Sequence, residues 1–445
     1  MRVEYDKLIP ALKRLLPAQG LDRLGAATRF IRRLRTVSAS MFVWAVVLSR
    51  FGQGTPGFDQ ARRWFNKLSA TGIWARPFQM RFKRPETVRM FEEAFDAAVE
   101  SWRTKKRTPR HPLVRHFADV VAWDSTVVQV SDALRGHFKG TRGAAASLKV
   151  TLGVSLWGLL PVAARVDAGN CHDMKLGPPL DLFRKGTLLL FDKGFVAYSR
   201  LAEIGRTGHF FLCPMRLNGD AEIVEVHQAP NTAKKACKSA ACAQAPGARP
   251  RGLMLREVLP KDKRIRKHWD LEVLVRGYDK RPTRVRLVIV PGPDGKQQPY
   301  LTNLGPAQWR PEALRELYRL RWQVELVFKE LKQHLNLTAM PSKDPFAVQV
   351  LAWASLIALA LSRTVADWIV PLHRHAGLAF ALRPAVLTRA LRSHIHLLGR
   401  ALSLPIRQAV ALLEVLALQL LDEASQPARA RPDSFKRLEG LLNAA

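Results

Sequence analysis

Five short apolar runs in the first half of the chain constrain its fold most strongly. Each run is rich in apolar and β-branched residues and is bounded by glycine or proline, a pattern typical of β-strands. The stretch before the last run, residues 195–208, predicts a short helix that ends in glycine. Strands separated by helices predict an α/β core. The five runs are residues 118–130, 148–158, 160–169, 186–194 and 209–216.

The sequence on either side of this core has a different pattern. The first hundred residues have apolar residues at helical spacing, and from Pro311 onward the pattern is helical again, with Pro311 suited to a first helical turn. The segment between these parts is loop-rich and basic, and three further runs in it predict antiparallel strands (269–278, 283–290 and 298–304). We therefore expect five parts: a helical region (1–110), the first part of the core (111–216), a β-rich insertion (217–310), a core helix (311–340) and a helical C-terminal region (341–445).

The chain is strongly basic. It has 71 Lys and Arg against 37 Asp and Glu, a formal net charge of +34, and 47% hydrophobic residues, which excludes a disordered basic tail. Residues 1–110 hold 23 basic and 9 acidic residues, net +14, whereas residues 111–210 hold 12 and 8, net +4. The excess favours a polyanionic partner such as DNA or RNA, and the alternative is a generally cationic solvated surface.

The sequence does not favour secretion, a disulfide-stabilised fold or ATP-driven chemistry. The four cysteines are too scattered for a disulfide framework, the N-terminus has no apolar signal-peptide region, and no phosphate-binding GxxxxGK[ST] loop occurs. We therefore expect a cytoplasmic protein. The charge-free run 346–362 is just short of a membrane span, but Gln349, Trp353 and Ser355 interrupt it, so a buried core helix and no membrane partner are predicted.

The segment ELYRLRWQVELVFKELKQHLNL, residues 316–337, is the most informative for function. On one continuous helix, Tyr318, Arg321, Glu325 and Lys332 would share a stripe about 60° wide beside an apolar face. Such a helix could bury one side in the core and present a carboxylate and cations from the adjoining side. The alternative is an ordinary amphipathic helix with an exposed Arg321–Glu325 pair.

Two aspartates on predicted strands favour the functional interpretation. Asp124 lies inside the apolar run VVAWDSTVV, where an unpaired charge would be unfavourable. Asp192 follows LLLF and precedes a glycine turn, and ligand sites favour the carboxyl ends of strands. Together with Glu325 they could form a cluster of carboxylates, the ligands that hard divalent metals need. Two metals held in this way would serve phosphodiester chemistry.

At these residues the sequence resembles the bacterial DDE insertion-sequence transposases of the subgroup marked by Y-x2-R-x3-E-x6-K, the insertion-sequence-four-like family. The signature is Tyr318-x2-Arg321-x3-Glu325-x6-Lys332, and the acidic blocks are WDST at Asp124 and DKGF at Asp192. The resemblance implies a ribonuclease-H-like core, interrupted by the β-rich insertion. It also implies that Asp124, Asp192 and Glu325 are catalytic and hold two Mg²⁺ ions, for which Mn²⁺ substitutes. Tyr318, Arg321 and Lys332 would bind DNA phosphates.

The resemblance further implies cut-and-paste transposition: nicking of an element end, hairpin formation and strand transfer to target DNA. Region 1–110 would bind the element ends, and a homodimer would pair two of them near the nucleoid. Two alternatives are a non-catalytic basic DNA-binding protein and a simple metal-dependent nuclease on the same core. The intact acidic triad argues against the first, and the signature argues against the second.

Several other residues have weaker claims. Asp119 and Asp167 are expected to face water, Asp173 suits a helix start, and Asp132 is a fourth rival carboxylate. A zinc site could be imagined from Cys213, His227, Cys237 and Cys242, although its segment has the composition of a disordered loop. Members of the family that form hairpins stack a flipped base on an aromatic residue. Candidates for that role are Trp269, Trp309 and Trp322, and the ordinary alternative for each is packing in the core.

Overall fold

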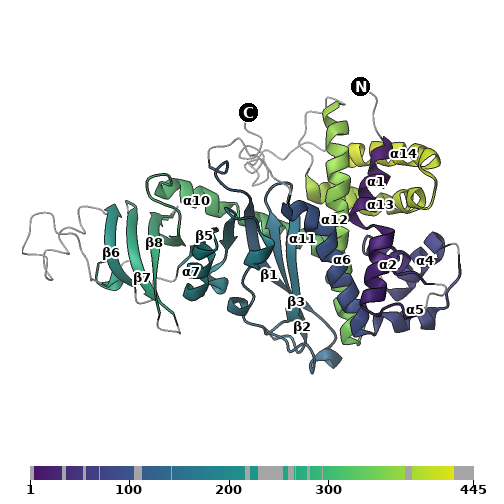
Figure 1. Ribbon diagram of the computed structural model, residues 1–445, viewed down its shortest axis with the longest axis horizontal. Coiled ribbons are helices and arrows are strands. Elements are labelled where there is room, and N and C mark those ends of the chain that lie inside the picture. Colours follow the sequence, from purple (N-terminus) through teal and green to yellow (C-terminus); the bar gives the residue numbers. More distant parts are fainter. Residues whose placement is uncertain are drawn as a thin grey trace, which may run out of the picture.

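The computed structural model is elongated, with a sheet through its centre and one end and a body of helices at the other end (Figure 1). It describes residues 5–32, 37–53, 57–69, 71–104, 113–141, 143–215, 221–228, 254–258, 265, 267–277, 281–292, 294–375 and 383–424.

All five strands expected in the core are present and belong to one sheet. The chain places β1 in the middle, antiparallel to β2 on one side and parallel to β4 on the other, and β4 is in turn parallel to β5. β3 pairs antiparallel with β2 and forms the edge. The strands are β1 (Val120–Gln129), β2 (Ser147–Ser155), β3 (Leu160–Ala168), β4 (Leu188–Phe191) and β5 (Phe210–Pro214).

The strands of the expected insertion extend this sheet. β9 pairs antiparallel with β5, so the nine strands run in the order β3-β2-β1-β4-β5-β9-β8-β7-β6. The three expected strands are β7 (Trp269–Arg276), β8 (Pro282–Pro291) and β9 (Gln297–Thr302), and a fourth, β6 (Ala221–Gln228), was not expected. The short helix α9 (Leu255–Val258) precedes β7, and the low-complexity stretch 229–251 lies outside the described residues.

Alternating side chains of the core strands pack into two separate apolar clusters. Val120 and Ala122 belong to the cluster shared with the long helices, whereas Val121 and Trp123 belong to the cluster on the opposite face. The second face is covered by α7 (Tyr198–Arg206), whose buried residues are Leu201 and Ile204. Because side chains alternate along a strand, Asp124 continues the row that faces the long helices.

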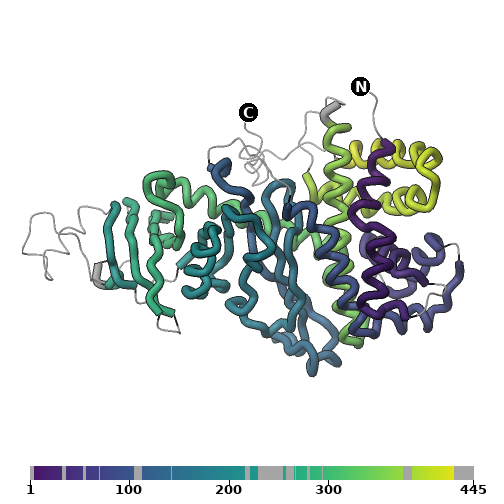
Figure 2. Tube along the Cα trace, in the orientation of Figure 1, coloured from purple at the N-terminus to yellow at the C-terminus, as the bar shows by residue number. Residues whose placement is uncertain are grey.

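The helices from the two ends of the chain form a single body. α12 contacts α1, α3 and α6 from the N-terminal part as well as α13 and α14, and the purple N-terminal helices lie beside the yellow C-terminal helices in Figure 2. The helices are α1 (Leu8–Leu15), α2 (Ala18–Ala27), α3 (Ala39–Ser49), α4 (Phe58–Ser69), α5 (Ala75–Phe82), α6 (Pro85–Thr104), α12 (Pro345–His375), α13 (Pro384–Leu402) and α14 (Ile406–Ala424). In the most apolar 18-residue window of α12, 83% of the residues are buried within the protein, as expected for a core helix.

The expected single helix around Glu325 is divided into two. α10 (Pro311–Arg319) and α11 (Trp322–His334) meet at a joint where the amides of Leu320, Arg321 and Val324 bond to carbonyls three residues earlier. Such i→i+3 turns rotate about 120° per residue instead of 100°, so side chains three apart become eclipsed. The angles calculated for a continuous helix therefore do not apply across this joint, but Tyr318 and Arg321, which are three residues apart, still lie on one side, with the Arg321 guanidinium carbon 5.8 Å from the Tyr318 ring centroid.

A buried ion pair fixes α11 to the helical body. Glu330 of α11 accepts two hydrogen bonds from Arg363 of α12, at 2.8 and 2.7 Å, and a third from Thr388 of α13 at 2.6 Å. The side chains of Glu330 and Arg363 are only 2% and 1% exposed. Three successive helices, α11, α12 and α13, are thus joined at one point on the helix that carries Glu325.

We expect Arg363→Met to lower the free energy of unfolding by about 3–5 kcal/mol, because it leaves the buried Glu330 carboxylate without its cation. The double variant Glu330→Leu/Arg363→Met should be more stable than Arg363→Met alone, since neither charge remains. Urea unfolding followed by circular dichroism measures both. The control is Arg319→Met, which removes an exposed pair with Glu316 and should change stability by less than about 1 kcal/mol. A double variant less stable than the single one would contradict this account.

Candidate active site

The acidic residues lie where strand β4 ends. In the parallel pairing of β1 with β4, Val120 lies opposite Leu188 and Trp123 opposite Phe191. The next step of this register sets Asp192 level with Asp124. β1 continues to Gln129, paired with β2, while β4 stops at Phe191. Beyond Asp124, β1 therefore has an open edge at the carboxyl end of its parallel neighbour, the edge at which α/β proteins place ligands.

Arg321 connects two of the expected catalytic carboxylates. Its guanidinium donates to Asp124 Oδ2 at 2.7 Å and to Glu325 Oε1 at 2.5 Å. The Arg321 and Asp124 side chains are 15% and 17% exposed, and Glu325 is 32% exposed. Glu325 lies in the first turn of α11, where a negative charge is favourable. The joint between α10 and α11 thus places one cation between a strand carboxylate and a helix carboxylate.

The crowding of carboxylates changes the protonation of Asp124. Burial raises the pKa of Asp124 to about 6, and the negative charges of Glu325 and Asp192 also raise it. Arg321 and the backbone amide of Ser125 lower it, but they do not cancel the effect of burial. A carboxyl group with this raised pKa would be stabilised as a carboxylate by an added cation.

Tyr318 and Lys332 lie on either side of this centre. Tyr318 packs against Arg321, whose guanidinium carbon is 5.8 Å from the ring centroid, and against Tyr300 of β9 at 5.0 Å between centroids. Burial raises the pKa of the Tyr318 phenol, which keeps it protonated. Lys332 lies two turns beyond Glu325, with its Nζ 3.5 Å from the carbonyl of Val127 on the open edge of β1, and burial lowers its pKa.

The residues suit a divalent cation by their chemistry, because carboxylate oxygens are the ligands such ions prefer. Their arrangement is less simple than expected. Among the residues that the structure describes, no three His, Cys, Asp or Glu side chains are placed to hold a metal ion as they stand. The Arg321 guanidinium provides the positive charge between Asp124 and Glu325.

The sequence analysis missed the role of Asp173 and Lys149. Asp173 does begin the short turn η3 (Asp173–Lys175), as expected. Its carboxylate also accepts hydrogen bonds from Ser125 Oγ at 3.1 Å and from Lys149 Nζ at 2.8 Å. It therefore links β2 to the strand residue next to Asp124. The available signal was Lys149 itself, a charge within an otherwise apolar strand that requires a partner.

The remaining rival carboxylates lie elsewhere. Asp119 is half-buried and accepts a hydrogen bond from Ser155 Oγ at 2.8 Å, so the expectation that it faces water was wrong. Asp167 is 25% exposed and lies 3.7 Å from Arg165. Asp132 is exposed and begins the turn η2 (Asp132–Leu134).

The structure separates the three candidate tryptophans. Trp269 and Trp309 are 2% and 4% exposed, and Trp309 stacks on Phe117, so both pack in the core. Trp322 is 51% exposed and adjoins Arg321 at the start of α11, which makes it the candidate of the three that a base could reach.

The proposed zinc ligands receive no support from the part of the chain described. Cys213 is fully buried in β5, and His227 lies 3.8 Å from Glu272 on β7. Cys237 and Cys242 lie outside the described residues.

Comparison with known proteins identifies the family of this chain. Residues 115–361 match the family of transposase DDE domains, a span that contains Asp124, Asp192, Glu325 and Lys332. The transposase of insertion sequence element IS231F from Bacillus thuringiensis subsp. israelensis is 22% identical over 400 residues, which are 80% of this chain and 79% of that protein. The transposase of insertion sequence element IS421 from Escherichia coli is 41% identical over 61 residues, 14% of this chain and 16% of that protein.

Among solved structures, a piggyBac transposase in a synaptic complex with hairpin DNA is similar, with 9% identity and a TM-score of 0.44, covering 98% of this chain and 85% of that one. The family match covers more than half of the 445 residues, and a relative named as an insertion-sequence transposase matches over 80% of the chain. This chain therefore belongs to the DDE transposase family of bacterial insertion sequences and is an enzyme that acts on DNA.

Proposed function

We propose that this transposase moves DNA by cut and paste, with Asp124, Asp192 and Glu325 as its catalytic carboxylates. The observation that carries the proposal is the contact of one guanidinium with two of them. Asp124 and Arg321 are 197 residues apart in the chain, yet a hydrogen bond of 2.7 Å joins them. Asp192 directly follows Phe191, which pairs with Trp123 beside Asp124, and this register supports a place for Asp192 in the same centre. Carboxylates gathered in this way serve phosphoryl transfer.

The proposal extends to the architecture. We take β1 to β5, with α11 on one face and α7 on the other, as the ribonuclease-H-like core, and β6 to β9 as the β-rich insertion. The arrangement in support is one continuous sheet in which β9 joins β5. The insertion thus begins directly beside the core strand that follows the Asp192 block.

Asp124, Asp192 and Glu325 would hold Mg²⁺ or Mn²⁺. A bound divalent cation would activate a water or hydroxyl group and stabilise the charge that develops on the phosphodiester. The fold of the chain brings the carboxylates together. Before a metal ion binds, Arg321 compensates the negative charge of Asp124 and Glu325. For the cation to reach both Asp124 and Glu325, the Arg321 guanidinium must release at least one of them. It is then free to form a bidentate contact with a phosphate.

The reaction consists of four transfers at one centre. Attack by water nicks the element end and frees a 3′-hydroxyl, and this hydroxyl attacks the opposite strand, which closes a hairpin and releases the flanking DNA. A second water opens the hairpin and restores the 3′-hydroxyl, which then attacks target DNA and joins the end to it. Tyr318, Arg321 and Lys332 would bind phosphates near the cut, and region 1–110, with its net charge of +14, would bind the element ends. We propose a homodimer for pairing two ends and a location in the cytoplasm at the nucleoid.

We expect Asp192→Asn and Glu325→Gln each to reduce Mg²⁺-dependent nicking of end-containing DNA by at least about a hundredfold. DNA binding should be retained, because it depends on Lys and Arg contacts with phosphates. Gel analysis of nicked and hairpin products measures the first, and a gel shift the second. Asp132→Asn, at an exposed turn, is the matched control and should nick normally.

The outcomes separate this proposal from its alternatives. Nicking that survives both variants would remove the catalytic assignment. Nicking by the native chain without hairpins or joined products would indicate a simple nuclease, and binding without nicking would indicate a DNA-binding protein.

We expect the nicking rate at subsaturating Mg²⁺ to fall by about tenfold per pH unit below about pH 6. Burial raises the pKa of Asp124 to about 6, so below that pH the proton occupies the carboxylate that the cation needs. Single-turnover rates between pH 5 and 8 test this, and higher Mg²⁺ should move the midpoint to lower pH. DNA binding over the same range is the control. A midpoint near pH 4 that does not respond to Mg²⁺ would contradict the role of Asp124.

A further inference from the structure

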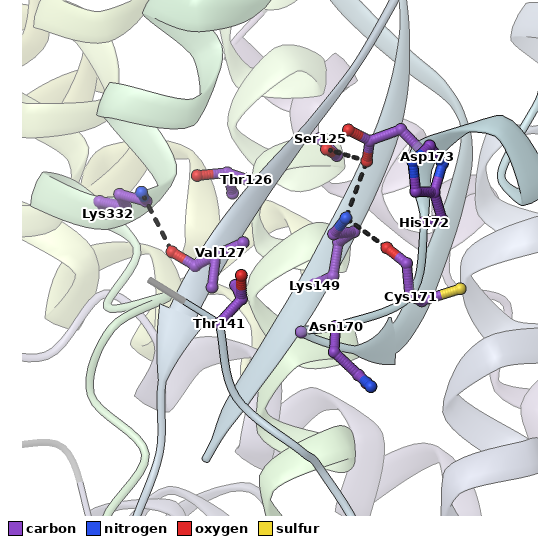
Figure 3. A pocket seen from close by; sticks show the side chains of 11 residues that line it. Ser125, Thr126, Val127, Thr141, Lys149, Asn170, Cys171, His172, Asp173 and Lys332 are labelled. Carbon is purple, nitrogen blue, oxygen red and sulfur yellow. Dashed lines mark hydrogen bonds and ion pairs between the residues drawn. The ribbon is translucent and has the colours of Figure 1, made fainter. Parts of the chain in front are cut away.

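A polar cavity adjoins the catalytic centre, on the open edge of β1 (Figure 3). Its volume is about 370 Å³, within the range of small-ligand sites. The walls come from Ser125 to Val127 of β1, Lys149 of β2, residues 169–173 after β3, and Lys332 of α11, with Thr141 on the connection before β2. The cavity begins at Ser125, the residue after Asp124. Because side chains alternate along a strand and Lys149 pairs with Val127, Ser125 and Lys149 lie on the face of the sheet opposite to Asp124, and the cavity adjoins the catalytic centre across β1.

The chemistry of the lining suits an anion. Two ammonium groups, of Lys149 and Lys332, lie on opposite sides of β1 in Figure 3. The hydroxyl groups of Thr126 and Thr141 add hydrogen-bond donors, whereas the Ser125 hydroxyl already donates to Asp173. Asp173 is the one carboxylate among the lining residues, and Lys149 already compensates it at 2.8 Å. The lining therefore has one more cation than anion.

Lys149 is held so that it can bind a further group. Its side chain is 9% exposed, and it donates to the carbonyl of Cys171 and to Asp173 Oδ1. An ammonium has three N–H donors, and these two contacts use two of them. Asp173 in turn lies beside the turn after Asp192, because a Cβ on Gly194 would be 3.0 Å from Asp173 Oδ2. The Lys149–Asp173 pair is thus placed against both aspartate blocks of the catalytic centre.

We propose that this cavity binds one phosphodiester group of the DNA strand that passes through the catalytic centre, with Lys149 as the contact on the β2 side and Lys332 on the α11 side. The proposal rests on the function proposed above, since DNA must lie over Asp124 to reach the cavity. It adds Lys149 as a DNA-binding residue. Asp173 becomes a positioning residue that orients Lys149 and competes with the phosphate for it.

The opposite charges of Lys149 and Asp173 give the test. We expect Lys149→Gln to weaken binding of end-containing duplex in EDTA about tenfold and to reduce the slope of log K against log salt by about 0.9, the loss of one phosphate contact. Asp173→Asn should bind DNA at least as tightly as the native chain, because it removes a competing carboxylate. Fluorescence anisotropy over a salt series measures both. The control is Lys139→Gln, at an exposed position outside the cavity.

A second measurement locates the phosphate. Neutral methylphosphonate linkages are placed one at a time along the strand near the cut. For the native chain, a methylphosphonate at one position should reduce DNA affinity. At that position the same linkage should cause no further loss of affinity in Lys149→Gln, but it should still reduce the affinity of Lys139→Gln. Inorganic phosphate is also added as a competitor. If the cavity binds a phosphate of the DNA strand, low concentrations of phosphate should leave the DNA bound, whereas a site for the free ion would release it. Displacement of DNA by low phosphate would contradict the proposal.

Two further results would overturn the proposal. One is an equal loss of DNA affinity in Lys149→Gln and Asp173→Asn with an unchanged salt slope, which would make the pair a structural brace only. The other is an undiminished methylphosphonate effect in Lys149→Gln. If Lys149→Gln does not fold, as judged by circular dichroism, Lys149→Arg replaces it and should keep the salt slope. Because these measurements need no cleavage, a failed nicking assay with the native chain would count against the proposed function and not against the cavity.

Discussion

The contact of Arg321 with Asp124 and Glu325 is the interaction on which the site depends. A buried carboxylate without compensation is strongly unfavourable, and here burial already raises the pKa of Asp124 to about 6. One guanidinium at 2.7 and 2.5 Å from the two carboxylates makes their approach possible. The end of β4, the joint between α10 and α11, and the open edge of β1 all contribute to this single arrangement. In the proposed function, the Arg321 guanidinium that bonds to both carboxylates releases at least one of them when a metal ion binds.

Contacts with the helical body fix the position of α11. Glu330 binds Arg363 and Thr388 behind the helix, and at its end Asn336 donates to the carbonyls of Arg50 and Gly52 at 2.8 and 2.9 Å. Residues from the N-terminal helices, α12 and α13 therefore meet on the helix that carries Glu325 and Lys332. The parts of the chain expected to bind DNA ends are in this way attached directly to the catalytic helix.

Sequence periodicity predicted the elements that are regular and failed where they are not. The apolar runs that became β1 to β5 and the charge-free run of α12 were recognisable because burial dictates their composition. The joint at Leu320–Arg321 was not, because the apolar residues on both sides fit one continuous helix. β6 was missed because Glu222 and Glu225 interrupt its apolar residues. Within the site, the four-residue signature indicated Arg321 and Glu325. The charge of Lys149 in an apolar strand indicated that it has a partner, but that partner, Asp173, lies 24 residues away and could not be identified from the sequence.

The most direct test of the account is a crystal structure of the enzyme with end DNA and Mn²⁺, with the anomalous signal of manganese used to locate the ion. The account predicts manganese bound by oxygens of Asp124, Asp192 and Glu325, with Arg321 released from at least one carboxylate and turned toward a phosphate. Manganese bound at other residues, or Arg321 still bonded to both carboxylates at saturating Mn²⁺, would contradict it.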